Sequence, residues 1–225
     1  MTITTCIFDA YGTLFDVGAA ARLAAQEPDH AVLRDIWPQI ARDWWHKQLQ
    51  YTWLRAVAGQ HCDFWQVTQD GLDWAMDAAK LIAPETRERL LALYWELDAY
   101  PEAPEMLAKL QTRGLNTGIL SNGSPDMLEA AVSSAGLEAL IDVSLSVETV
   151  GVFKPHKSVY DLVGQHFGCS PTQVLFVSSN GWDAAGAAQY GFRTAWVNRA
   201  DEPKDRLFAD PHHTLPDLTG ILELV

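Results

Sequence analysis

This chain has 225 residues, of which 48% are hydrophobic and 20% charged, so it can bury the core of one large domain or of a domain with a smaller insertion. Its 29 acidic and 16 basic residues give a net charge of −13, which argues against nucleic acid or another polyanion as a partner. No apolar stretch has the roughly 20 residues that cross a bilayer, so we expect no membrane partner.

The N-terminal residues and the cysteines predict a cytoplasmic protein. Met1 leads directly into a stretch typical of a strand, without the basic region and cleavage site of a signal peptide. The three cysteines, Cys6, Cys62 and Cys169, are odd in number and lack the spacing of metal ligands. We therefore expect reduced thiols, as in proteins of a reducing compartment.

The first predicted strand, residues 2–8, ends in the carboxylate of Asp9 and a turn at Gly12. Open α/β folds carry out their chemistry at the carboxyl edge of the sheet, and backbone amides freed by a turn can hold a carboxylate rigidly. Asp9 is then a candidate nucleophile. An aspartate that only caps the turn is the alternative, and this stretch alone leaves both open.

Residues 17–97 are expected to form a helical insertion. Apolar residues recur at spacings of three and four, first at Ile36, Ile40 and Trp44. The same spacing continues at Leu49, Trp53, Ala56 and Val57. Seven of the nine tryptophans fall in this segment, and we assign most of them to packing. An insertion directly after a nucleophile loop can exclude water from the site.

The rest of the chain alternates predicted strands with predicted helices. The strands are expected at residues 115–120, 141–146, 174–177 and 194–197. The helices are expected at 104–113, from Pro125 onward, at 155–167 and at 182–190, before a short tail that ends at 222–225. This alternation predicts an α/β protein with a doubly wound, Rossmann-like parallel sheet, formed by residues 1–16 and 98–225, and a helical cap at 17–97.

Polar residues follow the later predicted strands. Ser121 and Asn122 precede a helix that Pro125 can start, so hydroxyl, amide and N-terminal N–H groups converge on a site suited to an anion. Ser124 can also cap that helix, and the two roles are compatible. Lys154 follows the next strand, where a lone lysine is usually a solvated loop charge.

Three stretches carry a resemblance: FDAYGTLFD at residues 8–16, LSNGSPDML at 120–128 and FVSSNGWDAAGA at 176–187. They are similar to motifs of the haloacid dehalogenase superfamily, and of its L-2-haloacid dehalogenase branch in particular. KQLQYTWLR at 47–55 resembles a cap motif of the same branch. The resemblance covers essentially the whole chain and implies a hydrolase with a Rossmann-like core and a cap domain.

The resemblance also implies a reaction in two steps. Asp9 would displace the C2 substituent of a short 2-substituted carboxylate with inversion, as in (S)-2-haloacid dehalogenases, and water would then release a 2-hydroxy acid from the ester. Asp183, paired with Lys154, would activate that water. Ser178, Asn180 and Thr13 would complete the catalytic group. The residues that would surround the substrate are Ala10, Tyr11, Trp45, Leu49, Phe64, Ser121, Asn122, Tyr160 and Trp182.

Two substitutions relative to the superfamily's phosphatases argue against phosphoryl transfer. Those enzymes have a second aspartate at the position of Tyr11, and a tyrosine, with an ordinary pKa of about 10, is a poor proton donor near neutral pH. They also hold Mg²⁺ with two acids in the loop where this chain has only Asp183, close to the cation of Lys154. We therefore expect catalysis with no metal and no cofactor.

Trp45 departs from the pattern of the branch. Aligned on Lys47, L-2-haloacid dehalogenases carry an arginine at this position, and that arginine faces the leaving halide. One hypothesis is that another group, such as Asn122 or Trp182, receives the halide here. The other is that the leaving group is not an anion, as in an L-azetidine-2-carboxylate hydrolase, which would open the ring to 2-hydroxy-4-aminobutyrate.

A non-catalytic binding module built on this fold is the remaining alternative, and the joint presence of Asp9, Lys154 and Asp183 disfavours it. None of the seven histidines lies in these motifs, and His46 is the one kept as a candidate, although packing is its usual role. The expected partner is a small 2-substituted carboxylate. A homodimer is left open.

Overall fold

The computed structural model describes residues 2–225, and its centre is a six-stranded parallel sheet in the order β3-β2-β1-β4-β5-β6. The strands are β1 (Thr5–Phe8), β2 (Asn116–Ser121), β3 (Val143–Ser146), β4 (Val174–Ser178), β5 (Arg193–Val197) and β6 (His213–Leu215). This confirms the predicted α/β class with a doubly wound sheet. The strand order changes direction between β1 and β4, which is where such sheets bind ligands.

The central strand β1 positions Asp9. All four of its residues are buried, as a strand with neighbours on both sides and helices on both faces requires. Phe8 is paired with Ile119 of β2 and with Val177 of β4. Asp9 comes next, and its N–H donates to the carbonyl oxygen of Val177 at 2.9 Å. The register therefore places Asp9 at the carboxyl edge, level with Ser178.

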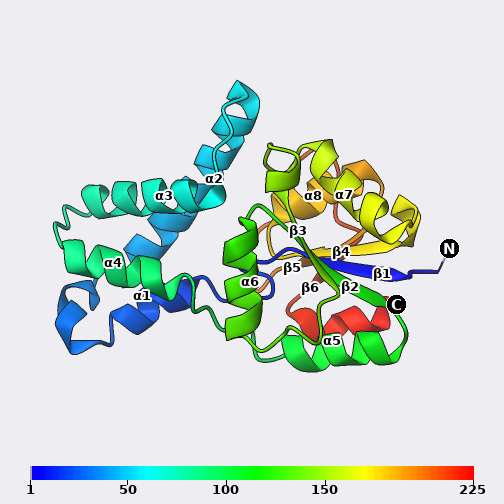
Figure 1. The fold of residues 1–225 in the computed structure, drawn as a ribbon, viewed down its shortest axis with the longest axis horizontal. Coiled ribbons are helices and arrows are strands. Elements are labelled where there is room, and N and C mark those ends of the chain that lie inside the picture. The colour runs from blue at the N-terminus through cyan, green and yellow to red at the C-terminus, as the bar shows by residue number, and fades with distance from the viewer. Residues whose placement is uncertain (1) are drawn as a thin grey trace.

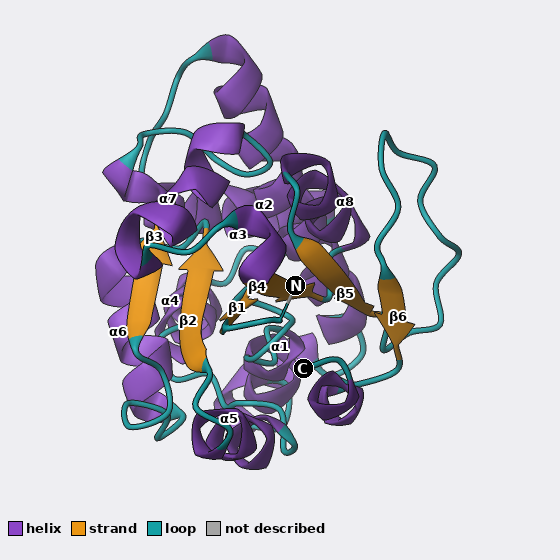
Figure 2. Cartoon of the chain, turned by 90° about the vertical axis from the view of Figure 1, so that its right-hand side faces the viewer, coloured by secondary structure: helices purple, strands orange, loops and turns teal. Residues whose placement is uncertain are grey.

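Helices cover both faces of this sheet. α7 (Lys157–Phe167) and α8 (Gly181–Tyr190) lie on one face, and α5 (Ala103–Thr112) lies on the other beside the 3-10 helix η4 (Leu218–Glu223) (Figure 1). The remaining elements of the core are α6 (Pro125–Ser134), η2 (Val147–Thr149) and η3 (Pro171–Gln173). Figure 2 shows β3 and β6 at opposite edges of the sheet.

The segment between β1 and α5 is helical and lies to one side of the core (Figure 1). Its elements are α1 (Gly18–Ala24), η1 (Pro28–Leu33), α2 (Trp37–Ala58), α3 (Phe64–Ala78) and α4 (Pro84–Leu93). We call this segment the cap. The predicted limits of the cap, residues 17 and 97, stay a prediction.

Two adjacent extended stretches connect the cap to the core. Phe15 forms an isolated bridge with Ala99. Two backbone hydrogen bonds flank that bridge, from Asp16 N–H to the Asp98 carbonyl at 3.1 Å and from Tyr100 N–H to the Leu14 carbonyl at 2.8 Å. The chain therefore leaves and re-enters the core at one place.

α2 is one helix of 22 residues, and only its first half follows the predicted apolar spacing. The buried residues of α2 are Ile40, Trp44, Gln48 and Thr52, which lie one turn apart. The predicted apolar face was wrong for Trp53 and Val57, whose exposed fractions are 37% and 90%. Figure 1 shows that this end of α2 projects past α3, so α3 does not cover it.

Other expectations need smaller corrections. Ser124 precedes α6, but its side chain makes no capping hydrogen bond. The predicted tail contains the strand β6 and the helix η4, which sequence patterning missed because β6 has only three residues. The three cysteines are free thiols. Among residues 2–225, none of the helices combines the length and the apolarity needed to cross a membrane.

Candidate active site

The Asp9 carboxylate is 7% exposed and has hydrogen-bond donors at both oxygens. Oδ1 accepts from Lys154 Nζ at 3.1 Å. Oδ2 accepts from Asn180 Nδ2 at 3.0 Å and from Thr13 Oγ1 at 3.1 Å. Ser178 Oγ lies 3.5 Å from the same oxygen. The structure thus brings these five predicted residues together from three separate loops.

Lys154 is fully buried, and its ammonium donates hydrogen bonds to both Asp9 and Asp183. Its Nζ also donates to Asp183 Oδ2 at 2.8 Å, and neither residue has exposed surface. Tyr160 donates its hydroxyl to the other Asp183 oxygen at 2.8 Å. The backbone N–H of Lys154 donates to Asn122 Oδ1 at 3.0 Å, which fixes the start of the lysine side chain. Lys154 is therefore not the solvated loop charge that a lone lysine usually is.

Burial and charge set the protonation of this group. Burial lowers the pKa of Lys154, but the carboxylates of Asp183 and Asp9 outweigh it, so the pKa is raised and the ammonium stays charged. Burial raises the pKa of Asp183 to about 6, and repulsion from Asp9 adds to it, while Lys154 and Tyr160 oppose the change. Asp183 can therefore exchange a proton near neutral pH, as a general base must.

A small cavity of about 30 Å³ lies between the core and the cap, with Asp9 on its wall. The residues that line it are Asp9, Tyr11, Trp45, Gln48, Leu49, Phe64, Tyr94, Ser121, Asn122, Asn180 and Trp182. None of these side chains is cationic. Seven of the nine predicted substrate contacts therefore line this cavity, and the wall from the cap is aromatic or neutral.

The core side of the cavity has donors for a carboxylate. Ser121 Oγ accepts from Gly123 N–H at 3.0 Å and Asn122 Oδ1 accepts from Lys154, so the Ser121 hydroxyl hydrogen and the Asn122 Nδ2 group stay available. The hydrogen bonds of the described chain include none from the N–H groups of Ala10 and Tyr11. Ser121 and Asn122 thus offer donors on the cavity wall, and the N–H groups of Ala10 and Tyr11 follow Asp9 directly in the chain, as the predicted anion site requires.

Tyr11 stands where a second acid would be needed for phosphoryl transfer. Its ring packs between Phe64 and Tyr94, with centroid separations of 5.8 and 5.5 Å. A side chain at Gly123 would lie only 2.8 Å from the Tyr11 ring, so this position has room only for glycine. Burial raises the pKa of Tyr11 well above its ordinary value, and Tyr94 and Asp9 add to the effect. Tyr11 is therefore a poor acid.

Two predicted contacts do not line the cavity. Ala10 is buried, and only its backbone N–H is available to a ligand. Tyr160 lies behind Asp183 in place of contacting substrate, because its position on α7 aims the hydroxyl at that carboxylate. Tyr160 is a positioning residue for Asp183.

Two residues of the cap wall were not predicted. Gln48 Nε2 donates to Thr68 Oγ1 at 2.9 Å and to the Tyr94 hydroxyl at 3.1 Å, and all three side chains are buried. Gln48 lies one turn after Trp44 on the buried face of α2, so helical spacing contained a signal for it. Tyr94 follows α4, and no local pattern of the sequence indicates its contact with Gln48.

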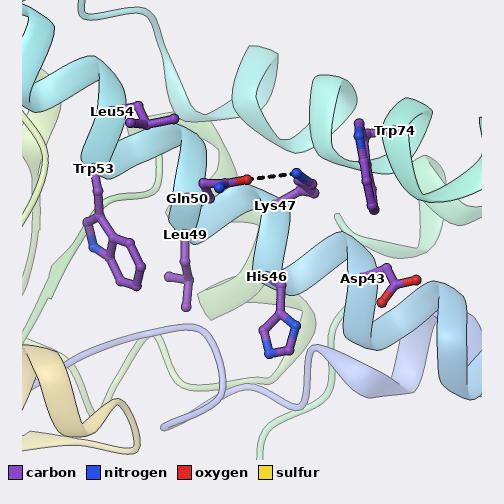
Figure 3. Close-up of a pocket in the computed structure, with 8 residues that line it drawn as sticks. All are labelled: Asp43, His46, Lys47, Leu49, Gln50, Trp53, Leu54 and Trp74. Atoms are coloured by element: carbon purple, nitrogen blue, oxygen red, sulfur yellow. Dashed lines mark hydrogen bonds between the residues drawn. The ribbon is translucent and has the colours of Figure 1, made fainter. Parts of the chain in front are cut away.

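A larger hollow of about 580 Å³ is lined by residues of α2 and by Trp74 of α3, and Asp9 is not among them (Figure 3). Lys47 Nζ donates there to Gln50 Oε1 at 2.7 Å and lies 4.0 Å from the Trp74 ring centroid. His46, the candidate histidine, lines this hollow and not the cavity at Asp9. It therefore has no part in the catalytic group.

The described residues contain no group of three or more His, Cys, Asp or Glu side chains placed to hold a metal ion. The family model for haloacid dehalogenase-like hydrolases matches residues 3–191. The chain belongs to this family.

Curated relatives of this hydrolase extend over nearly its full length. It is 37% identical to (S)-2-haloacid dehalogenase 1 of Pseudomonas sp. (strain CBS-3) over 224 residues, which are 99% of this chain and 96% of the relative. It is 43% identical to the (S)-2-haloacid dehalogenase of Xanthobacter autotrophicus over 204 residues, 89% of this chain and 77% of the relative.

Solved structures that resemble this chain are dehalogenases as well. The hydrolase matches the L-2-haloacid dehalogenase of Xanthobacter autotrophicus with chloropropionic acid covalently bound, at a TM-score of 0.87 and 36% identity, covering 99% of this chain and 98% of the other. A dehalogenase with an intermediate complex matches at a TM-score of 0.91 and 35% identity, covering 100% and 97%.

Proposed function

We propose that this hydrolase is a 2-haloacid dehalogenase of the (S)-specific type, which displaces the halogen at C2 of a short 2-haloacid and releases the 2-hydroxy acid with inversion. The observation that carries the proposal is the Asp9 carboxylate, which is held by Lys154 and Asn180 on the wall of a cavity with anion donors. The names of the relatives, and the covalently bound chloropropionic acid in one of them, support the same reaction.

In the first step an Asp9 oxygen attacks C2 from the side opposite the halogen. The new C–O bond forms as the carbon–halogen bond breaks, and the bonding electron pair leaves with the halide. Ser121, Asn122 and the N–H groups that follow Asp9 hold the substrate carboxylate during this attack. The Lys154 ammonium, 3.1 Å from Asp9, offsets the repulsion between the nucleophile and the anionic substrate.

In the second step water adds to the ester carbon of Asp9. Asp183 accepts a proton from that water, and Lys154 holds the Asp183 carboxylate in place. Asn180 and Ser178 donate toward the Asp9 oxygen on which negative charge develops. The bond between the ester carbon and the substrate oxygen then breaks, and the departing alkoxide takes the proton. The product hydroxyl oxygen comes from Asp9, and the solvent oxygen stays in its carboxylate.

Isotope labelling tests this mechanism. With enzyme in excess over (S)-2-chloropropionate in ¹⁸O-water, we expect the first product to carry unlabelled hydroxyl oxygen and the peptide containing Asp9 to gain mass. Label in the hydroxyl of the first product would show direct attack by water, and the ester mechanism would then be wrong.

We also propose that no metal takes part. The Lys154 ammonium lies 3.1 and 2.8 Å from the two carboxylates and supplies the positive charge at this place. Chloride release is expected to be the same with EDTA, with Mg²⁺ and with neither. Loss of turnover on chelation, restored by Mg²⁺, would contradict the proposal.

A second candidate function is the opening of L-azetidine-2-carboxylate to 2-hydroxy-4-aminobutyrate. The observation that favours it is the neutral indole of Trp45 on the cavity wall, where a cation would repel a protonated ring nitrogen by about 4 kcal/mol at 4 Å and an effective dielectric near 20. Purified protein is to be assayed with (S)- and (R)-2-chloropropionate, L-azetidine-2-carboxylate and a phosphate ester. Chloride release from the (S)-acid alone supports the first function, and ring opening without chloride release supports the second.

We also propose that the protein forms a homodimer and is cytoplasmic. The projecting end of α2 exposes Leu54, which lines the hollow of Figure 3, and Val57, at 59% and 90%, and a second copy of the chain would bury them. Sedimentation of wild type and Val57→Asp tests the dimer, since only a dimer held by α2 would dissociate in the variant.

The three free thiols support the cytoplasmic location, because thiols stay reduced in a reducing compartment.

A further inference from the structure

Arg199 follows β5 and lies outside the catalytic group described above. Its side chain is 23% exposed, and Nη1 donates to Glu102 Oε1 at 2.6 Å. Nη2 donates to the backbone carbonyl of Thr13 at 3.3 Å. The guanidinium carbon lies over the Tyr100 ring, 3.6 Å from its centroid. One side chain thus ties together two segments of the chain that are far apart in the sequence.

The two segments are those that connect the cap to the core. Thr13 lies two residues before Phe15, and Tyr100 directly follows Ala99. Phe15 and Ala99 form the isolated bridge between the two connections. Arg199 therefore holds both connections on the core side of that bridge.

Thr13 carries this restraint to the nucleophile. Its hydroxyl donates to Asp9 Oδ2 at 3.1 Å and accepts from the Ser179 N–H at 2.8 Å. Thr13 is fully buried, and in the described part of the chain only Arg199 donates to its carbonyl. Without Arg199 that buried carbonyl would lack a donor, and the backbone would shift to reach one. Such a shift displaces the hydroxyl that orients Asp9.

We propose that Arg199 is a positioning residue for Asp9, because it fixes the carbonyl of Thr13 and thereby the Thr13 hydroxyl. This inference rests on the proposed function, in which an Asp9 oxygen attacks C2. Arg199 does not line the cavity, so its charge is not needed at the substrate. Its planar guanidinium is needed, because it donates to a carboxylate and a carbonyl at once while it lies on the Tyr100 ring.

A double-mutant cycle of Arg199→Met and Thr13→Val tests the route through Thr13. We expect Arg199→Met to lower kcat/KM for (S)-2-chloropropionate about 10-fold, since small displacements of a reacting group are costly. Thr13→Val removes the hydroxyl and with it the link to Asp9. In that background Arg199→Met should lower kcat/KM by less than about twofold, whereas a residue that acts only on folding would have the same effect in both backgrounds.

Glu102→Gln separates the contact with Thr13 from the ion pair. Glutamine keeps an acceptor for Nη1 and leaves the contact between Arg199 and Thr13 intact. Its kcat/KM should therefore stay within about twofold of wild type, even where its midpoint of urea denaturation falls. A loss of kcat/KM in Glu102→Gln equal to that of Arg199→Met would assign the effect to the ion pair and overturn the proposal.

Two other variants complete the set. Arg199→Lys has a single ammonium in place of the two-pronged guanidinium, so it should lose kcat/KM as Arg199→Met does. It takes the place of Arg199→Met in the cycle if circular dichroism shows that Arg199→Met is unfolded. Arg113→Met is the matched control, because Arg113 also donates to backbone carbonyls, but to those of Leu222 and Val225. It should keep the wild-type kcat/KM.

The outcomes distinguish this inference from the proposed function. If wild type releases no halide from any 2-haloacid, the proposed function fails. If wild type releases halide but the Arg199 variant keeps its kcat/KM, Arg199 does not position Asp9. If the variant loses the same factor with and without the Thr13 hydroxyl, Arg199 does not act through Thr13. In both of these cases the dehalogenase function stands.

Discussion

Lys154 is a buried cation between two carboxylates, so its removal should affect stability as well as catalysis. In Lys154→Met two like charges would face each other without solvent, and breaking such a buried group costs about 3–5 kcal/mol of unfolding free energy. The pKa of Asp183 would rise further, so the folded variant would bind protons that the unfolded chain has released. The loss is therefore expected to be larger at pH 8 than at pH 5.

Urea denaturation at the two pH values measures this effect. Lys157→Met is the matched control, because Lys157 is 75% exposed and its ion pair with Asp161 spans 3.7 Å. The control should stay within about 0.5 kcal/mol of wild type. A loss in Lys154→Met that does not depend on pH would show that packing, and not charge, accounts for it.

Tyr160 should control the pH at which the enzyme becomes active. Asp183 must be deprotonated to accept a proton from water, so kcat is expected to fall as the pH drops through about 6. The Tyr160 hydroxyl bonds to the charged carboxylate and lowers its pKa. Tyr160→Phe should then move the acid limb of kcat upward by about one pH unit.

The control for this prediction is Tyr190→Phe, because Tyr190 also packs on the Tyr160 ring but donates its hydroxyl to Asp161, at 2.7 Å, and not to Asp183. Its pH profile should match that of wild type. An acid limb of Tyr160→Phe that stays in place while kcat falls at every pH would assign Tyr160 to packing alone.

The prediction of site residues succeeded where polar residues directly follow a predicted strand. Asp9 and Asp183 each follow a predicted strand, and parallel strands bring their carboxyl ends to one edge, so their proximity follows from topology. The role of Lys154 came from the resemblance, because a lone lysine in a loop is usually solvated. Gln48 and Tyr94 were missed because their contact joins residues 46 apart in the chain, one on α2 and one just after α4. Helical spacing shows which face of a helix is buried, but not which residues pack against that face.

At the scale of elements, a few side chains join the cap to the core. His61, in the turn between α2 and α3, lies 2.9 Å from Glu148 in η2, and its ring packs on Phe153 at 4.6 Å. Trp53 of α2 contacts Trp182 of α8. These contacts hold the wall of the cavity in place, although they touch neither Asp9 nor its donors.

We expect a double-mutant cycle of His61→Ala and Glu148→Ala to show that this pair acts as a unit. Each variant should raise KM about two- to fivefold with little change in kcat, and the double variant should be no worse, with a coupling of about 0.5–1 kcal/mol. Arg87→Ala is the control, because its ion pair with Asp73 lies within the cap. Additive effects of His61→Ala and Glu148→Ala would show that the pair does not join cap and core.

The prediction of helices and strands was limited in the same way, because local patterns do not show what packs against an element. The core strands were found because continuous apolar runs and polar ends mark parallel strands. α2 was foreseen as helical, but the exposure of its second half was not, because Trp53 and Val57 repeat at the same spacing as the buried residues before them. Whether the face is covered depends on where α3 begins, and the local spacing of apolar residues does not contain that information.

At the scale of the whole molecule, the small cavity implies motion. About 30 Å³ holds roughly one water, so a haloacid enters only when cap and core separate. The two adjacent connections at Phe15 and Ala99 are the covalent path between the parts, and a small rotation there would open the wall that carries Trp45 and Phe64. Closure then removes water from Asp9 before the ester forms.

The net charge of −13 gives a last prediction, because the proposed substrate is also an anion. A protein with 29 acidic and 16 basic residues repels a carboxylate at long range, whereas the Lys154 ammonium and the neutral donors near Asp9 attract it at the site. Salt screens the long-range repulsion within about 8–10 Å but has little effect on the attraction of the buried ammonium.

kcat/KM for (S)-2-chloropropionate is therefore expected to rise about two- to threefold between 10 and 200 mM ionic strength, set with sodium sulfate to avoid added halide. L-azetidine-2-carboxylate has no net charge, and its kcat/KM, or its inhibition constant if it is not turned over, should stay nearly constant. A fall of kcat/KM with salt for the haloacid would mean that the local positive charge at Asp9 outweighs the field of the whole chain.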